Sequence, residues 1–313
     1  MTAASLVFQQ VAIMFLLILA GAFLTRRGML SPKGASELST VLLYLIVPAL
    51  IIRSFIRPVS TDLLIGLGLS VLLAFLFHLL AIKCSQLLHG KSIEETAILR
   101  MGSIYSNCGF MAFPILDVLY GDLGVFYGSV FVAVFNIFLW SHGVWLLKPH
   151  QKVSFKKAIL NPGCIPVLVG CFLFIFGISI PNILNTTFGY LAATNTPIAM
   201  IVIGIYLAKV PIKSVIGDRR IWQTSILKVL VIPIIFLLLM LIVNAVLGIA
   251  SFKVIYAVMI ICCACPTASS VLLLPSAFGM KETVGVKIVL LSTILSLVSI
   301  PMITMLTQWL LFQ

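Results

Sequence analysis

The chain of 313 residues is 62% hydrophobic and only 9% charged, and its formal net charge is +12. Soluble domains carry about 25% charged residues, and a water-soluble fold of this length could not bury so much apolar surface. The composition therefore excludes an ordinary soluble domain and places the chain among membrane proteins.

Ten apolar segments follow one another along the chain, and each has about the 20 residues that a helix needs to cross a bilayer. They cover residues 6–25, 36–56, 62–82, 96–118, 122–147, 161–180, 190–209, 221–247, 252–278 and 283–312. The first has no basic residue before it and no small-residue cleavage site, which favours a retained span over a signal peptide. We therefore predict an all-α membrane protein with ten transmembrane helices.

The second segment contains Pro48 near its middle and Arg53 five residues further on. A proline inside a helix removes one backbone hydrogen bond and clashes with the preceding turn, so the span is predicted to bend there. Arg53 either attracts anions to the outer mouth of a site or anchors the span at the interface. The anchoring role, with an extended side chain, is the favoured interpretation.

The fourth segment holds the stretch YSNCGFMAFP, residues 105–114, which weakens a helix within an apolar run. Pro114 removes a backbone hydrogen bond, Gly109 permits unusual backbone conformations, and Asn107 can donate and accept hydrogen bonds. Irregular backbone at membrane depth is tolerated only where protein covers it or where it lines a cavity. The stretch Asn107, Cys108, Gly109 is therefore predicted to form part of a binding site.

Isolated polar residues in the third, fifth and eighth segments receive structural interpretations. His78 and His142 are predicted to be hydrogen-bonded structural residues rather than proton relays. Asn136 and Asn244 are predicted to join neighbouring helices through hydrogen bonds. Lys228 is predicted to extend its ammonium group to the cytoplasmic interface.

The ninth segment contains a second interrupted stretch, CACPTASSVLLLP, residues 263–275. Pro266 breaks the helix, and Thr267, Ser269 and Ser270 supply hydroxyl groups beside the break. Two interrupted segments at corresponding places in two halves of a chain indicate a transport site. Proline kinks without a transport role are the alternative, since Ser and Thr often bond only to their own backbone.

An internal repeat relates the two halves of the chain. A shift of 149 residues, and after a nine-residue insertion a shift of 158, superimposes prolines and glycines of the two halves. The matched pairs include Gly21 with Gly170, Gly28 with Gly177, Pro48 with Pro197, and Gly121 with Gly279. We predict two five-helix repeats, 1–148 and 158–313, joined by a basic cytoplasmic linker, 149–157. Because five is odd, the second repeat is inverted, as in many secondary transporters.

The basic residues indicate how the chain is oriented. Sixteen of the twenty lie in links that follow an odd-numbered span, whereas Arg53, Arg57 and Lys253 lie on the other side and Lys228 lies within a span. The positive-inside rule then places those links in the cytoplasm and both termini outside. The net charge thus reflects orientation in a bilayer, and no nucleic-acid partner is predicted.

Acidic residues are rare within the spans, where Asp117 stands alone. The cluster of buried carboxylates that a sodium or proton relay uses is therefore missing. What remains at the breaks is amide, hydroxyl and backbone N–H groups at helix N-termini, which suit an anion. Asp117 either carries a coupling proton, pairs with Arg53, or lies in outer water.

The seven cysteines fall in or beside apolar spans and are interpreted as small hydrophobic residues, and no metal or other cofactor is predicted.

Four stretches together resemble the auxin efflux carrier family over nearly the whole chain. NCGFMAFPILDVLYG (107–121) is similar to the family's fourth-span signature and TPIAMIVIGIYLA (196–208) to its seventh-span motif. VPALI (47–51) and CPTAS (265–269) resemble its second- and ninth-span proline motifs. The resemblance implies ten spans in two inverted repeats, each with a scaffold and a mobile part, whose fourth and ninth helices cross at their breaks. It also implies Asn107 near a substrate carboxylate, with Pro114 and Pro266 at the crossover.

The chain departs from the plant carriers of that family at three points. Ile51 occupies a place where those carriers have a small hydroxyl residue, Asp117 replaces a basic residue, and the long cytoplasmic loop is reduced to about ten residues. These differences favour a bacterial-type short member that carries a small carboxylate or dicarboxylate, such as malate or malonate, over an auxin carrier.

We therefore predict a secondary transporter of a small organic anion in the plasma membrane, and not an enzyme. The substrate site would comprise Asn107, Cys108, Gly109, Thr267, Ser269 and Ser270. A channel or sensor of the same fold is the main alternative, and an intramembrane protease is disfavoured because no second membrane aspartate and no Ser–His motif accompany it. A homodimer is compatible with this architecture.

Overall fold

The computed structural model describes residues 3–149, 156, 159–208, 215, 217–247, 252–280 and 283–312. Within these ranges the regular structure consists of helices and one isolated antiparallel bridge between Ser106 and Thr267. Most of the predicted linker 149–157 lies outside the described residues, as do Lys209, Lys213 and Lys281, which contributed to the predicted orientation.

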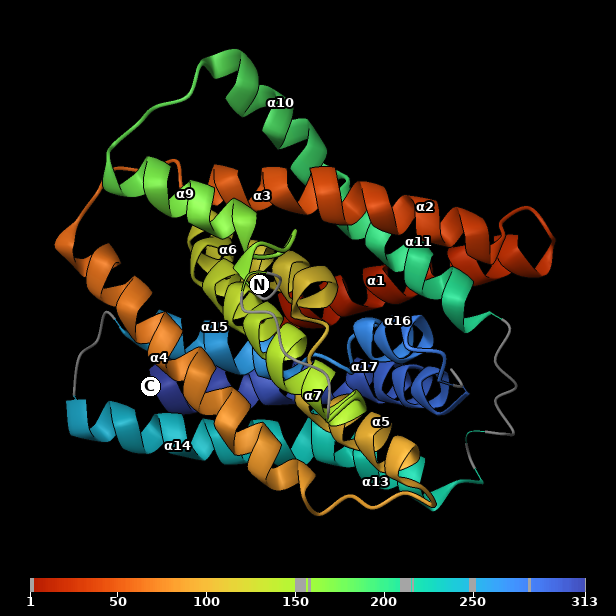
Figure 1. Cartoon of the computed structure of the whole chain (residues 1–313). Coiled ribbons are helices and arrows are strands. Elements are labelled where there is room, and N and C mark those ends of the chain that lie inside the picture. Colours follow the sequence, from red (N-terminus) through yellow and green to blue (C-terminus); the bar gives the residue numbers. More distant parts are fainter. Residues whose placement is uncertain are drawn as a thin grey trace.

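Fifteen α-helices are assigned in the described ranges, and π-helical turns adjoin several of them. Figure 1 labels the helices. They are α1 (Ala3–Arg26), α2 (Pro32–Val41), α3 (Val47–Ser54), α4 (Thr61–Ser85), α5 (Ile93–Ile104), α6 (Phe113–Phe138), α7 (Val144–Leu147), α9 (Ile165–Ile175), α10 (Asn182–Ala193), α11 (Asn195–Leu207), α13 (Arg219–Ile226), α14 (Ile232–Leu247), α15 (Lys253–Ala264), α16 (Ser270–Ala277) and α17 (Thr283–Phe312).

Seven stretches of the described residues are long and apolar enough to cross a membrane, so the prediction of ten continuous spans is met only in part. These stretches are Ser5–Arg26, Lys33–Ser54, Thr61–Ser85, Cys108–Leu147, Asn182–Leu207, Arg219–Val246 and Thr283–Phe312. The predicted span 161–180 contains only the 11-residue α9, and 252–278 is divided into α15 and α16. Apolar composition located these segments but could not reveal where their backbone leaves the helix.

The 40-residue stretch Cys108–Leu147 contains a reversal of the chain. Gly121, inside α6, has φ 57° and ψ −149°, far from helical values. A Cβ placed on Gly128 would lie 2.6 Å from Leu116 Cδ1 and 3.5 Å from Phe113 Cε1. In a continuous helix, Phe113 and Gly128 would be about 22 Å apart. The chain therefore folds back at Gly121, in agreement with the predicted boundary between residues 118 and 122.

The helices form two groups that pack on each other (Figure 1). In the first, α1 packs along α11, α3 packs on α9 and α10, and α2 contacts α11. Where α1 meets α11 there is no room for a side chain, because a Cβ on Gly204 would collide with the backbone of Ile18. In the second group, α6, α15 and α17 pack together and are flanked by α4, α5, α13 and α14.

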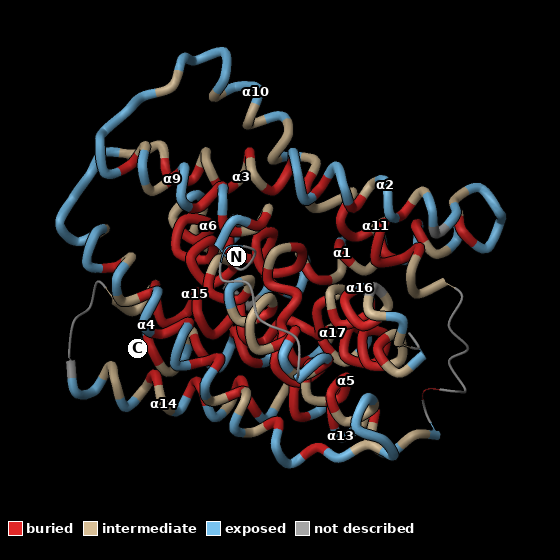
Figure 2. Tube along the Cα trace, viewed as in Figure 1, coloured by how far each residue is buried: buried red, intermediate tan, exposed pale blue. Residues whose placement is uncertain are grey.

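Burial is deepest where α5, α6, α15 and α17 meet (Figure 2). From Ile255 to Cys265 every residue is buried, whereas α10 contains no buried residue. Large apolar side chains remain exposed on the outer faces of α1, α4, α9 and α14, which is the expected exterior for helices that face lipid. The interior of the second group is therefore the most protected part of the molecule.

Four glycines with positive φ occur among the described residues, and they form the two pairs that the internal repeat matches. Gly28 and Gly177 have φ 76° and 62°, and Gly121 and Gly279 have φ 57° and 75°. A left-handed backbone is strained for residues with a Cβ, so each position needs glycine for the same reason. The sequence repeat thus coincides with a recurring local conformation.

Three prolines within apolar helices follow a π-helical turn. Leu42–Ile46 precedes Pro48, Cys108–Ala112 precedes Pro114, and Leu227–Val231 precedes Pro233. Proline cannot donate to the carbonyl four residues earlier and its ring crowds that carbonyl. The widened turn moves the crowded carbonyl aside, so the helix continues past the proline.

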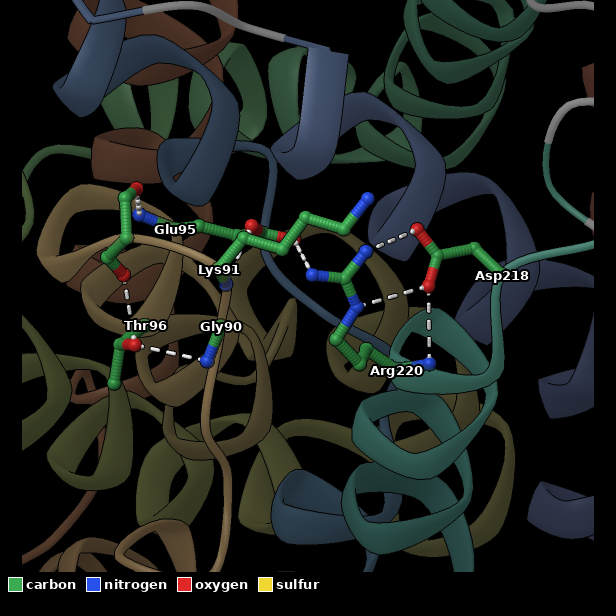
Figure 3. A network of polar contacts seen from close by, with 7 residues as sticks. Gly90, Lys91, Glu95, Thr96, Asp218 and Arg220 are labelled. Atoms are coloured by element: carbon green, nitrogen blue, oxygen red, sulfur yellow. Dashed lines mark hydrogen bonds and ion pairs between the residues drawn. The ribbon is translucent and has the colours of Figure 1, made fainter.

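A polar network fastens α5 to α13 at one end of the second group (Figure 3). Arg220 makes ion pairs with Glu95 at 2.7 Å and with Asp218 at 3.2 Å. Asp218 also caps α13 by accepting the Arg220 N–H. At the start of α5 the Ser92 hydroxyl accepts the Glu95 N–H, and the Glu95 carboxylate accepts the Lys91 N–H. The start of the predicted fourth span is thereby joined to the start of the eighth.

Candidate functional site

The two interrupted segments cross each other where both have lost their helical backbone. α5 ends at Ile104 and α15 ends at Ala264, and the next residues of each, Tyr105 and Cys265, are extended. The Asn107 N–H donates to the Pro266 carbonyl at 2.7 Å, and the Ala268 N–H donates to the Tyr105 carbonyl at 2.9 Å. A short antiparallel bridge thus satisfies backbone groups that helices would otherwise pair.

The prolines occupy different places relative to this crossing. Pro266 takes part in the bridge through its carbonyl, whereas Pro114 is the second residue of α6, beyond the π-helical turn. The break in the fourth segment lies at Tyr105, Ser106 and Asn107 instead. Pro48 is the second residue of α3, which follows a π-helical turn, and Pro197 lies in the first turn of α11 after an interruption at Thr194. These prolines shape their helices, but only Pro266 lies at the crossing.

Thr267 uses its polar groups to hold the crossing together. Its hydroxyl donates to the Gly102 carbonyl at the end of α5 at 2.7 Å, and its N–H donates to the Ser292 hydroxyl at 3.1 Å. The residue is fully buried and does not line the neighbouring cavity. Cys108 is also buried away from that cavity.

A cavity of about 350 Å³ adjoins the crossing, within the size range of small-molecule sites. Of the residues predicted to bind substrate, four line it: Asn107, Gly109, Ser269 and Ser270. Its walls are otherwise largely apolar, with contributions from α2, α6, α16 and the residues just before α9. Among the described residues, none that lines the cavity is acidic or basic.

Two polar side chains at the cavity have no protein partner within the described part of the chain. The Asn107 side-chain amide makes no such hydrogen bond although the residue is only 7% exposed. The buried Ser270 hydroxyl likewise has none. Both residues lie at the start of a helical segment, whose first N–H groups have no intrahelical partner and carry partial positive charge. The polar end of the cavity therefore offers hydrogen-bond donors.

Lys228 corrects a prediction, because it does not reach the cytoplasmic interface. It lies in the π-helical turn between α13 and α14 and is fully buried. Its ammonium donates to the Ser106 hydroxyl and, at 3.0 Å, to the Cys263 carbonyl at the end of α15. A lysine could not extend to water here, since α5, α15 and α17 pack against this turn. Ser106, which lines the cavity, stands between the ammonium and the cavity.

The two histidines make structural contacts, as predicted. His142 Nδ1 lies 3.0 Å from the Tyr105 hydroxyl, which also donates to the Phe138 carbonyl. His78 Nδ1 lies 2.7 Å from the Ala74 carbonyl, although its buried Nε2 has no partner among the described residues.

Asn136 differs from its predicted role. Its amide donates to the Val132 carbonyl of its own helix at 2.8 Å, and the residue lines the cavity instead of joining two helices. Asn244 does not line the cavity, and none of the hydrogen bonds found among the described residues involves its side chain. Asp117 is exposed and Arg53 half-buried, and within the described residues no ion pair joins them.

Sequence reasoning missed three residues of this site: Ser106, Asn136 and Lys228. Ser106 stands in the same interrupted stretch as Asn107 but has no distinguishing spacing. Lys228 had a recognisable signal, because Thr224 and Ser225 precede it by one helical turn and form a polar stripe within an apolar span. That pattern indicates a side chain that faces protein, whereas a snorkelling lysine needs no such neighbours.

Comparison with known proteins assigns the chain to a family. A family model described as membrane transport protein matches residues 6–155 and 150–304, which together cover nearly the whole chain. The chain belongs to the membrane transport protein family. This is the auxin efflux carrier type of family that the motifs indicated. An uncharacterized transporter of Methanocaldococcus jannaschii is 24% identical over 216 residues, which cover 65% of this chain and 70% of the relative.

Membership of the membrane transport protein family agrees with the long apolar helices and identifies a multi-pass membrane transporter. In this member of the family, the crossing provides backbone donors, an amide, a free hydroxyl and a nearby ammonium at one end of a largely apolar cavity. Such a combination can bind the charged end of a small acid while the apolar walls accept the rest of it.

Proposed function

We propose that the protein is a secondary transporter that carries a small organic anion by alternating access. The observation that supports this most directly is the unpartnered Asn107 amide beside the crossing, at the polar end of the cavity. Desolvated hydrogen bonds to a carboxylate are strong, and the two helix N-termini add partial positive charge. The absence of a carboxylate from the described lining residues supports an anion over a cation.

The substrate class proposed is a carboxylate or dicarboxylate such as malate or malonate, with an auxin-like weak acid as the alternative. A channel or sensor with the same fold would bind the acid without moving the binding site from exposure on one side of the membrane to exposure on the other. Saturable exchange of labelled acid across liposomes distinguishes a carrier from both.

The cavity suggests which side of the membrane the site faces in this conformation. Its lining beyond the crossing includes Ser39 in α2, Trp140, and Pro162 and Gly163 before α9. All lie toward the end that the positive-inside rule assigns to the cytoplasm. We therefore propose an inward-facing state, in a plasma-membrane protein with both termini outside.

The two inverted five-helix repeats remain part of this proposal. The paired glycines at 28 and 177 and at 121 and 279 support it. So does the packing, because Gly21 in α1 meets Ile201 in α11, while its repeat partner Gly170 in α9 meets Phe55 at the end of α3. Motion of the second helix group against the first would expose the site to each side in turn.

Replacing Asn107 with alanine tests the proposed site. Purified protein in liposomes loaded with malate would be assayed for uptake of radiolabelled malate by counterflow. Removing a hydrogen bond to a charged group costs about 1.5–3 kcal/mol, so uptake at limiting substrate should fall roughly 10- to 100-fold. The matched control is Asn244→Ala, the same change outside the cavity, which should transport like the unmodified protein. Unchanged uptake by correctly folded Asn107→Ala protein would remove Asn107 from the site.

A further inference from the structure

Lys228 is a buried lysine that has no counter-charge among the residues the structure describes. It is fully buried, and in the described part of the chain its ammonium contacts neutral groups alone: the Ser106 hydroxyl, the Cys263 carbonyl and, 5.5 Å away, the Phe77 ring. The ion pairs found among the described residues all involve Arg220, two helical turns away. An ammonium in such a place is costly unless an anion joins it or it gives up its proton.

The titratable groups around Lys228 do not offer a counter-charge. They are His78 from α4, Cys108 after the crossing, and Cys263 and Cys265 at the end of α15. The Cys263 and Cys265 thiols donate to the Ile260 and Ile261 carbonyls, so both carry their protons. His78 bonds to its own helix. No carboxylate belongs to this set.

A stripe of polar residues runs along the helix from Lys228 toward Arg220 at the start of α13. Thr224 and Ser225 lie one helical turn before it, are fully buried, and have hydroxyls without a partner among the described residues. One turn earlier, Arg220 lies in the polar network at the start of α13. Buried hydroxyls without partners are unfavourable, whereas water molecules would satisfy them and, together with the hydroxyls, would form a path for a proton.

The position of Ser106 links this cation to the proposed substrate. Its hydroxyl accepts a hydrogen bond from the Lys228 ammonium and donates one to the Cys263 carbonyl at 3.2 Å. Ser106 also lines the cavity. A carboxylate at the crossing would therefore lie within about two hydrogen-bond lengths of the ammonium. At an effective dielectric constant of about 20, a charge at that range changes proton affinity by on the order of 100-fold.

We propose that Lys228 is the proton-coupling residue of the carrier: it takes up one proton when a carboxylate enters the cavity and releases it when the carboxylate leaves. The neutral amine and a proton form the ammonium, whose positive charge offsets one negative charge of the anion, so that proton and anion cross together. The proton reaches the amine along the Thr224 and Ser225 hydroxyls. This rests on the proposed function, since it requires an anion at the crossing. Because binding of the proton and binding of the anion strengthen each other equally, the anion binds more tightly at lower pH.

Titration calorimetry of the detergent-purified protein with malate, in two buffers of different ionisation enthalpy, counts the protons bound with each anion. At about pH 7.5 both carboxyls of malate are ionised, so any proton taken up goes to the protein. The unmodified protein should take up a substantial fraction of one proton per malate. Malate binding without proton uptake would overturn the coupling but leave the proposed function intact. If malate and the other acids of a dicarboxylate panel do not bind at all, both fail.

Three variants test whether Lys228 is the residue that takes up the proton when malate binds. Lys228→Met should bind malate at least 10-fold more weakly and without proton uptake. Lys228→Arg keeps a permanent charge and its donors, because guanidinium does not lose its proton, so it should bind malate with no proton uptake. His78→Phe, the control, should take up protons like the unmodified protein.

Lys228 also caps the C-terminus of α15, and a purely structural lysine would behave differently. It would alter stability in both Lys228 variants while leaving proton uptake unchanged in Lys228→Arg. Proton uptake that persists in Lys228→Arg, or that disappears in His78→Phe, overturns the assignment. Because the arginine variant keeps the charge, its result stands even if Lys228→Met does not fold.

Discussion

Thr267 and Ser270 lie three residues apart in the same interrupted segment, and both were predicted to bind substrate, yet the structure gives them different surroundings. The Thr267 hydroxyl and N–H are both used at the crossing. Ser270 lines the cavity, and its hydroxyl has no hydrogen-bond partner among the described residues. A sequence shows which groups are polar but not which of them are already satisfied.

This difference predicts that the two residues respond in opposite ways to loss of their hydroxyl. Thr267→Val leaves the buried Gly102 carbonyl unpaired, which should cost about 1–3 kcal/mol and lower the melting temperature by several degrees. Ser270→Ala should leave the melting temperature nearly unchanged and weaken malate binding roughly 10-fold. Thermal unfolding and calorimetry of both variants check this, and a stable Thr267→Val protein with unchanged unfolding would contradict the role given to Thr267.

Lys228 shows a second limit of residue-by-residue interpretation. In an isolated apolar helix a lysine is best accommodated by reaching the interface. Burial becomes favourable only because the end of α15 brings the Cys263 carbonyl, and the broken fourth segment brings Ser106, to the same point. Those partners are 35 and 122 residues away along the chain.

At the scale of elements, the sequence predicted both interruptions and the position of the one in the ninth segment, at Pro266, but not the position of the one in the fourth. Proline and glycine identified the fourth and ninth segments correctly as interrupted. The break in the fourth, however, lies at Tyr105–Asn107, because a π-helical turn accommodates Pro114 without ending the helix. The choice between a break and a π-helical turn depends on whether another segment of the chain can form hydrogen bonds with the freed backbone groups. Here Pro266 and Ala268 form such bonds, and they do so at Tyr105 and Asn107.

The junction of α5 and α13 predicts a pH dependence of stability. Burial tends to raise the pKa of Asp218, but hydrogen bonds and charge from Arg220 outweigh it and hold that pKa below its usual value. A carboxylate whose pKa is lower when folded contributes stability above its unfolded pKa, near 3.9, and that contribution is lost as the pH falls through the folded value. The melting temperature should therefore drop below about pH 4.

Asp218→Asn should remove part of this decline, so that its melting temperature is lower than that of the unmodified protein near neutral pH but changes less on acidification. The control is Glu37→Gln, since Glu37 is exposed and lies outside this network. Equal slopes for Asp218→Asn and the unmodified protein between about pH 5 and 3 would show that this junction is not pH-sensitive.

At the scale of the whole molecule, family membership could be predicted from motifs spread along the chain, and the comparisons confirm the family. The fold was predicted in outline, because apolar length identifies most spans, although the predicted span 161–180 contains only the 11-residue helix α9. The division into inverted repeats stays a prediction, which the paired glycines support.

The central claim is that a carboxylate binds where the two broken helices cross. An experimental density map of the protein purified with malate and bound to a rigid antibody fragment tests it most directly. The account predicts extended backbone at residues 105–107 and 265–269, with a malate carboxylate within hydrogen-bond distance of the Asn107 amide and close to Ser106 and Ser270. Unbroken helices through either stretch, or malate bound away from the crossing, would contradict it.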